Sequence, residues 1–164
     1  MEAPACAGHL SDIAILLRKP AMPETQTTAP YAVALLRISQ GIMLLAHGAV
    51  LKLGTFGLAG TMGYFGSIGY PPVLGAIVTF AEILGGLALI AGFATRWVSL
   101  ALIPILLGAT LQHAGNGWLF NVTGGGWEYP AFWTVTLLVQ AGLGAGAWAL
   151  DGARPVAKRA ALAA

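Results

Sequence analysis

Charged residues and cysteines are both scarce in this chain. Only 9% of its 164 residues are charged, against 57% that are hydrophobic, and the mean hydropathy is +0.78. A soluble domain carries roughly 25% charged residues, so this chain has too little polar surface to cover a water-soluble globule. Cys6 is the only cysteine, which excludes an internal disulfide and the Cys-x-x-Cys chemistry of dithiol membrane enzymes. No basic patch is interleaved with aromatic residues, so nucleic acid is not expected as a partner.

Long apolar runs fill most of the chain instead. Each is close to the ~20 residues that a helix needs to cross about 30 Å of hydrocarbon. None shows a sustained alternation of apolar and polar residues, which argues against a membrane barrel, and in lipid only helices or closed barrels satisfy their backbone. We therefore expect an all-α integral membrane protein, a four-helix bundle surrounded by membrane lipids. The runs are Tyr31–Leu51, Val73–Phe93, Val98–Ala114 and Pro130–Leu150.

Lysine and arginine residues predict the orientation of these helices. They precede the first run, lie between the second and third, and follow the fourth, whereas the other side has only Lys52. By the positive-inside rule both termini are cytoplasmic, in a multi-pass protein of the bacterial inner (cytoplasmic) membrane. The connections Lys52–Pro72 and Gly115–Tyr129 then face outward. We expect the aromatic and glycine-rich segment Thr55–Pro72 to lie in the interface or to fold back on the bundle.

Three segments follow from this pattern. Residues 1–30 form an N-terminal extension, in which residues 13–17 are expected as a short surface helix and Pro20, Pro23 and Pro30 as part of an extended linker. Residues 31–151 form the four-helix domain, and residues 152–164 form a basic cytoplasmic tail. Small residues predict the packed helix faces, because they let helices approach closely in membranes. They are Gly75, Thr79 and Gly86, with Glu82 on the same face, in the second run, and Gly142 and Gly146 in the fourth.

One carboxylate, Glu82, lies near the middle of the second run. An ionisable group at that depth is costly unless it is paired or functional, so it is the first candidate for a site. On a helical wheel of about 100° per residue, Arg37, Gln40 and His47 of the first run fall within about 80°. We expect this stripe to face the bundle interior and Glu82 to pair with Arg37 or to hydrogen-bond His47. Two interpretations stay open: an ion pair that only sets helix register, and a proton-accepting carboxylate beside a redox or ligand pocket.

A second polar cluster is expected at the outward end of the bundle, where residues distant in sequence reach the same depth. A histidine there is suited to hydrogen-bond a quinone carbonyl and to relay protons near neutral pH. Two histidines on different helices also suit axial ligation of a haem iron, so haem stays an alternative, whereas a zinc site lacks ligands. The cluster comprises His47, Lys52, Gln112, His113, Glu128 and Tyr129.

Several of these residues stand in short motifs whose order and spacing resemble the DoxX family of small four-helix membrane proteins. The resemblance covers about residues 32–151 and implies a membrane subunit of an oxidoreductase system. The family's namesake is similar to a subunit of a thiosulfate:quinone oxidoreductase, which passes electrons from thiosulfate to membrane quinone. The motifs are Arg37…Gly41, His47–Leu53, Glu82–Gly86, Gly92–Arg96, Glu128–Pro130 and Leu150–Asp151.

This resemblance assigns roles to the polar residues. Glu82 is the expected proton acceptor, His47 the hydrogen-bond partner of a quinone cofactor, and Arg37 the balancing charge. The sequence has no recognisable redox centre, so electrons are expected from a partner subunit of a redox complex. A non-catalytic accessory subunit of a larger respiratory or photosynthetic complex is the alternative, and a small transporter is a third possibility. The other residues expected near the cofactor are Gln40, Gln112, His113, Glu128 and Tyr129.

Overall fold

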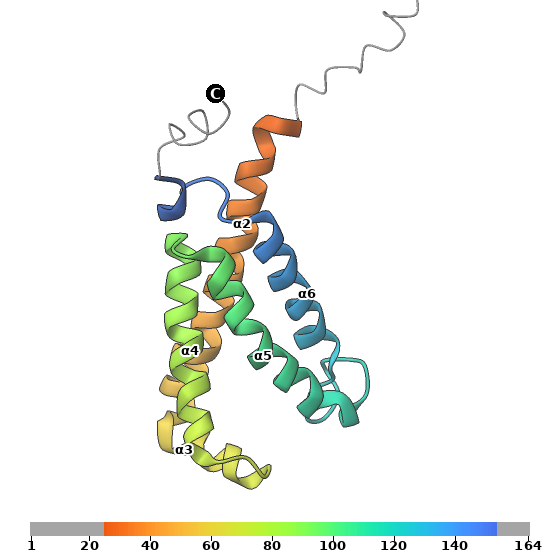
Figure 1. Cartoon of the computed structure of the whole chain (residues 1–164). Helices are drawn as coiled ribbons and strands as arrows, with labels where there is room; N and C mark the ends of the chain where they lie inside the picture. The colour runs from red at the N-terminus through yellow and green to blue at the C-terminus, as the bar shows by residue number, and fades with distance from the viewer. Residues whose placement is uncertain (1–24, 154–164) are drawn as a thin grey trace, which may run out of the picture.

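The computed structural model describes residues 25–153, and all regular secondary structure in that range is helical (Figure 1). The predicted surface helix at residues 13–17 and the basic tail from residue 154 lie outside the described residues. Pro30 lies inside the first helix, so the linker expected to extend to Pro30 is wrong at its end. The long helices are α2 (Thr25–Leu45), α4 (Pro72–Ala91), α5 (Thr95–His113) and α6 (Glu128–Leu143). The shorter elements are η1 (a π-helix, Ala46–Thr55), α3 (Gly57–Ser67), and the 3-10 turns η2 (Ala114–Asn116) and η3 (Leu150–Ala153).

Three helical segments are long and apolar enough to cross a membrane: Thr28–Thr55, Pro72–Ala91 and Thr95–Asn116. Their length and composition indicate a multi-pass membrane protein. Helix α6 has only 16 residues, so it extends about 24 Å at 1.5 Å per residue. The predicted fourth run is therefore wrong at its end, because Gly144, with a positive φ of 86°, ends the helix well before Leu150.

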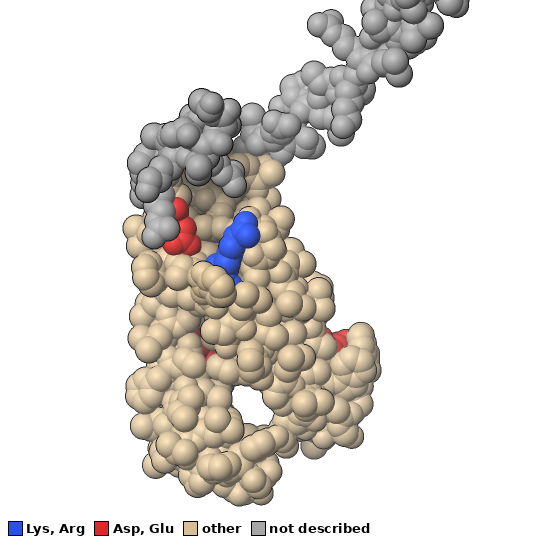
Figure 2. All heavy atoms as spheres, in the orientation of Figure 1, with Lys and Arg blue, Asp and Glu red and all other residues tan. Residues whose placement is uncertain are grey.

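The long helices form two pairs (Figure 1). Helix α2 packs along α4 and α5 packs along α6, and the pairs meet where α4 turns into α5. From that turn α4 and α5 diverge. Figure 2 shows an opening through the molecule between the α3–α4 side and the side of α5 with its following loop. We call the end with the α4–α5 turn the terminal end, because the start of α2 and η3 also lie there, and the opposite end the loop end.

Glycines allow α2 and α4 to approach closely. A Cβ on Gly41 would lie 2.7 Å from the carbonyl oxygen of Gly86, and one on Gly86 would lie 2.8 Å from that of Gly41. The predicted packed face of α4 is confirmed, since its four residues are all buried. The predicted packing of the fourth run through Gly142 and Gly146 is wrong. Gly142 faces open space, and Gly146 lies beyond the end of α6, against the backbone of α2 at Pro30 and Ala34.

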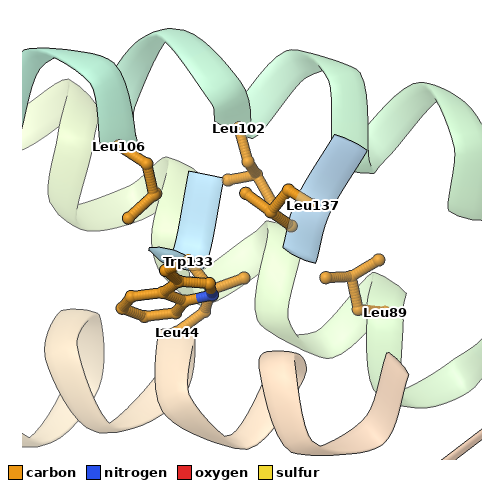
Figure 3. Close-up of a cluster of buried hydrophobic side chains, with 6 residues drawn as sticks. All are labelled: Leu44, Leu89, Leu102, Leu106, Trp133 and Leu137. Carbon is orange, nitrogen blue, oxygen red and sulfur yellow. The ribbon is translucent and has the colours of Figure 1, made fainter. Parts of the chain in front are cut away.

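Helix α3 folds back on the loop end of α4, as expected for this segment. Its backbone lies against α4 at Gly75, where an added Cβ would meet Met62 Cα at 3.1 Å. The hydroxyl of Thr61 donates to the carbonyl oxygen of Lys52 at 2.9 Å, which ties α3 to the π-helix. The apolar core lies between the two helix pairs and takes side chains from all four long helices (Figure 3). Its members are Leu44, Leu89, Leu102, Leu106, Trp133 and Leu137.

Candidate functional site

Arg37 is fully buried, and its guanidinium donates to backbone carbonyls rather than to Glu82. It bonds the carbonyls of Leu89 and Ile90 at the end of α4, the latter at 2.8 Å. Its Nε donates to Ala145 at 2.8 Å and its Nη2 to Ala147 at 3.1 Å, in the irregular chain after α6. These carbonyls lie in the last turn of α4 or beyond the end of α6, where the regular helical N–H partner is missing and a membrane supplies no water in its place. The Arg37–Glu82 pair expected from the sequence is therefore wrong, because the guanidinium is used to cap backbone.

Glu82 pairs with Lys52 instead. The Nζ atom of Lys52 lies 2.7 Å from one carboxylate oxygen of Glu82 and 2.6 Å from the other. The carboxylate side chain is 8% exposed and that of the lysine 21%, so the pair is largely withdrawn from solvent. The hydrogen bond expected between His47 and Glu82 is absent among the described residues, since His47 Nδ1 bonds the carbonyl oxygen of Met43. The ion pair thus joins Glu82 of α4 to Lys52 of the π-helix.

The π-helix explains why Lys52 reaches Glu82. In an α-helix of about 100° per residue, Lys52 lies outside the stripe of Arg37, Gln40 and His47. The hydrogen bonds of a π-helix run from i to i+5, so each residue turns through a smaller angle. This change rotates Lys52 onto the stripe and Leu51 off it. Leu51 is accordingly exposed at 39%, while the ammonium group of Lys52 turns inward.

Trp133 is the centre of an aromatic cluster, which we define as His47, Tyr129 and Trp133. The ring centroids of His47 and Trp133 are 5.2 Å apart, and those of Tyr129 and Trp133 are 5.7 Å apart. The Nδ1 atom of His47 lies 2.8 Å from the carbonyl oxygen of Met43. A carbonyl only accepts, so Nδ1 carries the proton and Nε2 of the neutral ring remains an acceptor. The Tyr129 hydroxyl lies 3.6 Å from the Met43 sulfur, a weak acceptor.

The remaining residues of the predicted outward cluster do not join His47. His113 Nδ1 bonds the carbonyl oxygens of Gly124 and Gly125 at 3.0 and 3.1 Å, so this histidine holds the loop between α5 and α6. Glu128 accepts the backbone N–H of Phe120 at 2.9 Å and holds the same loop. Gln112 is half-buried and takes no part in these contacts. Of the predicted cofactor residues, only His47 and Tyr129 therefore belong to the aromatic cluster, where both contact Trp133.

Gln40 lies about two helical turns from His47, on the terminal side. Its side chain is 2% exposed, and Nε2 donates to the carbonyl oxygen of Thr136 on α6 at 3.1 Å. The Oε1 atom of Gln40 has no partner among the described residues. Gln40 therefore belongs to the contact between α2 and α6 rather than to the aromatic cluster.

A shallow cavity of about 510 Å³ adjoins the aromatic cluster at the loop end. Tyr129 is shared between the two, since its side chain also lines this cavity. Most of the remaining lining is apolar, with the carboxylate of Glu128 at the edge. The other lining residues are Trp118, Phe120, Ala131, Phe132 and Val135.

Sequence reasoning missed three residues. Trp133 was given no place in the site, although its spacing of four from Tyr129 and from Leu137 places it on their helix face. Lys52 was assigned to the outward cluster. No pattern in the sequence predicts the π-helix that turns its side chain toward Glu82. Asp151 accepts the N–H groups of Ala94 and Thr95 at 2.9 and 2.8 Å, so its carboxylate caps the start of α5.

A comparison with protein families supports the resemblance drawn from the motifs. The model of the DoxX family matches residues 32–115, just over half of the chain. The match includes Arg37, His47, Lys52 and Glu82, whereas Tyr129, Trp133 and Asp151 lie beyond it. No curated protein and no solved structure matches the chain. Within residues 25–153, no three His, Cys, Asp or Glu side chains are placed to hold a metal ion.

Proposed function

Because the chain belongs to the DoxX family, we propose that it is the membrane subunit of an oxidoreductase system and binds a quinone headgroup at the aromatic cluster. The observation that carries the proposal is the pair of unused polar groups in this cluster. Nε2 of His47 is an acceptor, and the buried Nε1–H of Trp133 is a donor with no partner among the described residues. A quinone offers carbonyl acceptors, and its reduced form offers hydroxyl donors, so both groups find complementary chemistry.

Neighbouring residues also suit this ligand. Tyr129 adds a hydroxyl whose present contact with the Met43 sulfur is weak. The aromatic rings provide flat apolar surfaces for the headgroup, and the adjoining cavity of about 510 Å³ suits an apolar tail. When bound, a quinone supplies the capacity to take up two electrons and two protons. We propose that a partner subunit passes electrons to the quinone. The family resemblance implies a small reductant, such as thiosulfate, as their source.

The residues of the chain then have distinct roles. His47 holds a proton on Nδ1 and accepts one at Nε2, as a general base requires. The Lys52–Glu82 pair joins this same π-helix to α4, so it holds in place the element that carries His47. Arg37 keeps a structural role, because its N–H groups are occupied by backbone carbonyls.

Quinone binding tests the proposal directly. The probe is a quinone with a ten-carbon tail, titrated into the full-length protein in lipid nanodiscs and followed by quenching of tryptophan fluorescence. We expect saturable binding to the wild-type protein. His47→Phe keeps an aromatic ring but loses the acceptor, and should raise Kd about fivefold, since one hydrogen bond contributes about 1 kcal/mol.

His113→Phe is the matched control, because His113 contacts only the loop after α5 in this region. It should bind the quinone as the wild-type protein does. Binding that is absent in the wild-type protein, or equal in the two histidine variants, contradicts the proposal. Absent binding together with recovery of the protein in a large energy-transducing assembly would instead favour the accessory-subunit alternative.

A further inference from the structure

Five buried polar atoms lack a hydrogen-bond partner among the described residues, and none of them belongs to Arg37 or the Lys52–Glu82 pair. Their side chains are at most 5% exposed and come from α2, α5 and α6. A buried polar atom without a partner is costly, and native proteins usually satisfy such groups with ordered water. The atoms are Trp133 Nε1, Gln40 Oε1, Gln140 Oε1, Ser99 Oγ and Thr95 Oγ1.

The helix packing arranges these atoms in order along the bundle. Leu102 of α5 lies beside Leu137 of α6 in the core (Figure 3). Because α5 and α6 run antiparallel, the next turn toward the terminal end carries Ser99 on one helix and Gln140 on the other. Thr95 lies one turn further in the same direction.

The loop-end half of the series follows from α2 and α6. Gln40 bonds the carbonyl oxygen of Thr136, so it lies at the level of Leu137. Trp133 lies about one turn beyond Leu137, toward the loop end, in contact with His47. Successive levels are therefore about 5 Å apart. A water molecule that makes two hydrogen bonds of about 2.8 Å bridges atoms separated by up to about 5.6 Å.

We propose that ordered water molecules bridge these five atoms and form a proton path from the aromatic cluster to the terminal end of the bundle. The path goes beyond the proposed function, because it requires no quinone. Each water or hydroxyl takes a proton from one neighbour and releases its own to the next, so only O–H bonds form and break. Trp133, Gln40 and Gln140 hold the water molecules, while Ser99 and Thr95 are able to pass protons.

The terminal end provides an exit from this path. The backbone N–H of Thr95 bonds the carboxylate of Asp151, which is exposed to solvent. Gln140 Nε2 donates to the carbonyl oxygen of Gly144 at 2.6 Å, in the irregular segment that Arg37 holds. The proposed path thus ends at Thr95, whose backbone contacts this exposed carboxylate at the α4–α5 turn.

Hydrogen exchange of the Trp133 indole N–H tests the path. The full-length protein, labelled with 15N at tryptophan and held in nanodiscs, is transferred to D2O, and the indole signals are followed by NMR. Trp133→Phe identifies the signal of Trp133 by its loss. We expect this buried N–H to exchange at least about tenfold faster than core amides of α6, because exchange requires contact with solvent.

Ser99→Val fills the space with a larger apolar side chain and should slow the exchange about tenfold, whereas Ser99→Ala leaves room for water and should not. Thr95→Val keeps the shape of threonine and removes its hydroxyl, so it should also slow the exchange of the Trp133 indole N–H. This second variant keeps the test decisive if Ser99→Val does not fold. Thr134→Val is the matched control, because the Thr134 hydroxyl already donates to the carbonyl oxygen of Pro130 at 2.8 Å. Exchange as slow as that of core amides in the wild-type protein, or equal in Ser99→Val and Ser99→Ala, overturns the path.

Discussion

At the scale of single residues, this chain holds two inward-facing positive charges in different ways. Arg37 has several N–H groups in a fixed plane, which match several carbonyls that point into the bundle. Lys52 is a compact ammonium on a flexible stem, and it forms a close pair with the carboxylate of Glu82. The residue types therefore suit their tasks, although a wheel drawn from the sequence paired the arginine with the carboxylate.

Removing one member of the Lys52–Glu82 pair should destabilise the protein more than replacing both. Lys52→Met or Glu82→Gln leaves the other group without its partner in a largely buried place. Each should cost about 3 kcal/mol, at the low end for buried pairs because the lysine side chain keeps 21% exposure. The double variant Lys52→Met, Glu82→Met should lose less than either single variant. Measuring the free energy of unfolding of the wild-type protein, the two single variants and the double variant in one detergent tests this order of stabilities.

Glu128→Gln is the control for this series. The amide oxygen still accepts the N–H of Phe120, so stability should stay within about 0.5 kcal/mol of the wild-type protein. A double variant whose loss equals the sum of the two single losses would show that the pair has no coupling energy.

At the scale of secondary-structure elements, the π-helix Ala46–Thr55 determines what the site contains. Its first turn carries His47 and its second carries Lys52, so one irregular element brings both groups to α4 and α6. π-Helices are rare and often occur at functional sites, because they redirect side chains without ending the helix. Gly48 lies between the two residues, at the point where the element touches α4.

Gly48→Ala should therefore disturb both the packing and the site. A Cβ there would lie 2.9 Å from the carbonyl oxygen of Thr79 and 3.0 Å from Cβ of Glu82. The backbone of α4 would have to move, and overpacking of this kind costs about 1–3 kcal/mol. We expect a lower thermal unfolding midpoint in detergent and weaker quinone binding.

Gly108→Ala is the matched control, since a Cβ at Gly108 of α5 meets nothing within 4 Å. Alanine also favours a helix over glycine by up to about 1 kcal/mol, so this variant should be as stable as the wild-type protein or more stable. A Gly48→Ala protein that behaves like Gly108→Ala would show that the π-helix and α4 are not in close contact at this point.

At the scale of the whole molecule, the two helix pairs are joined firmly at one end and diverge at the other. Arg37 links α2, the end of α4 and the segment after α6, and Asp151 links that segment to the start of α5. The loop end has α3 on one side, the α5–α6 loop on the other, and the opening between them (Figures 1 and 2). A ligand from the lipid phase has room to approach the inner helix faces at this end.

The positive-inside rule predicts that the terminal end faces the cytoplasm. The single cysteine, Cys6, tests this without any added label site. In spheroplasts a membrane-impermeant maleimide should leave the protein unmodified, and in inside-out vesicles it should modify Cys6. Cys6→Ser is the control for labelling of other groups. Modification of Cys6 in intact spheroplasts would show the opposite orientation, with the terminal end outside.

The sequence by itself determined the solvent of this protein and much of its architecture. Composition and run length set the membrane class and the positions of α2, α4 and α5, because lipid demands long apolar helices. Helix periodicity also located the inward-facing stripe of Arg37, Gln40 and His47, since polar side chains avoid lipid. The aromatic and glycine content of the segment Thr55–Pro72 gave two placements, in the interface or folded back on the bundle, and α3 adopts the second.

Only the tertiary structure decided how those polar residues are used. A run of apolar residues says little about where a helix stops, so the positive φ of Gly144 and the capping role of Arg37 were hidden. The π-helix that pairs Lys52 with Glu82 depends on packing against α4, and helical wheels assume a constant turn per residue. The hydrogen-bond and ion-pair partners of these residues were thus unpredictable from the sequence. They depend on how each helix is rotated and where it ends, and contacts with distant segments determine both.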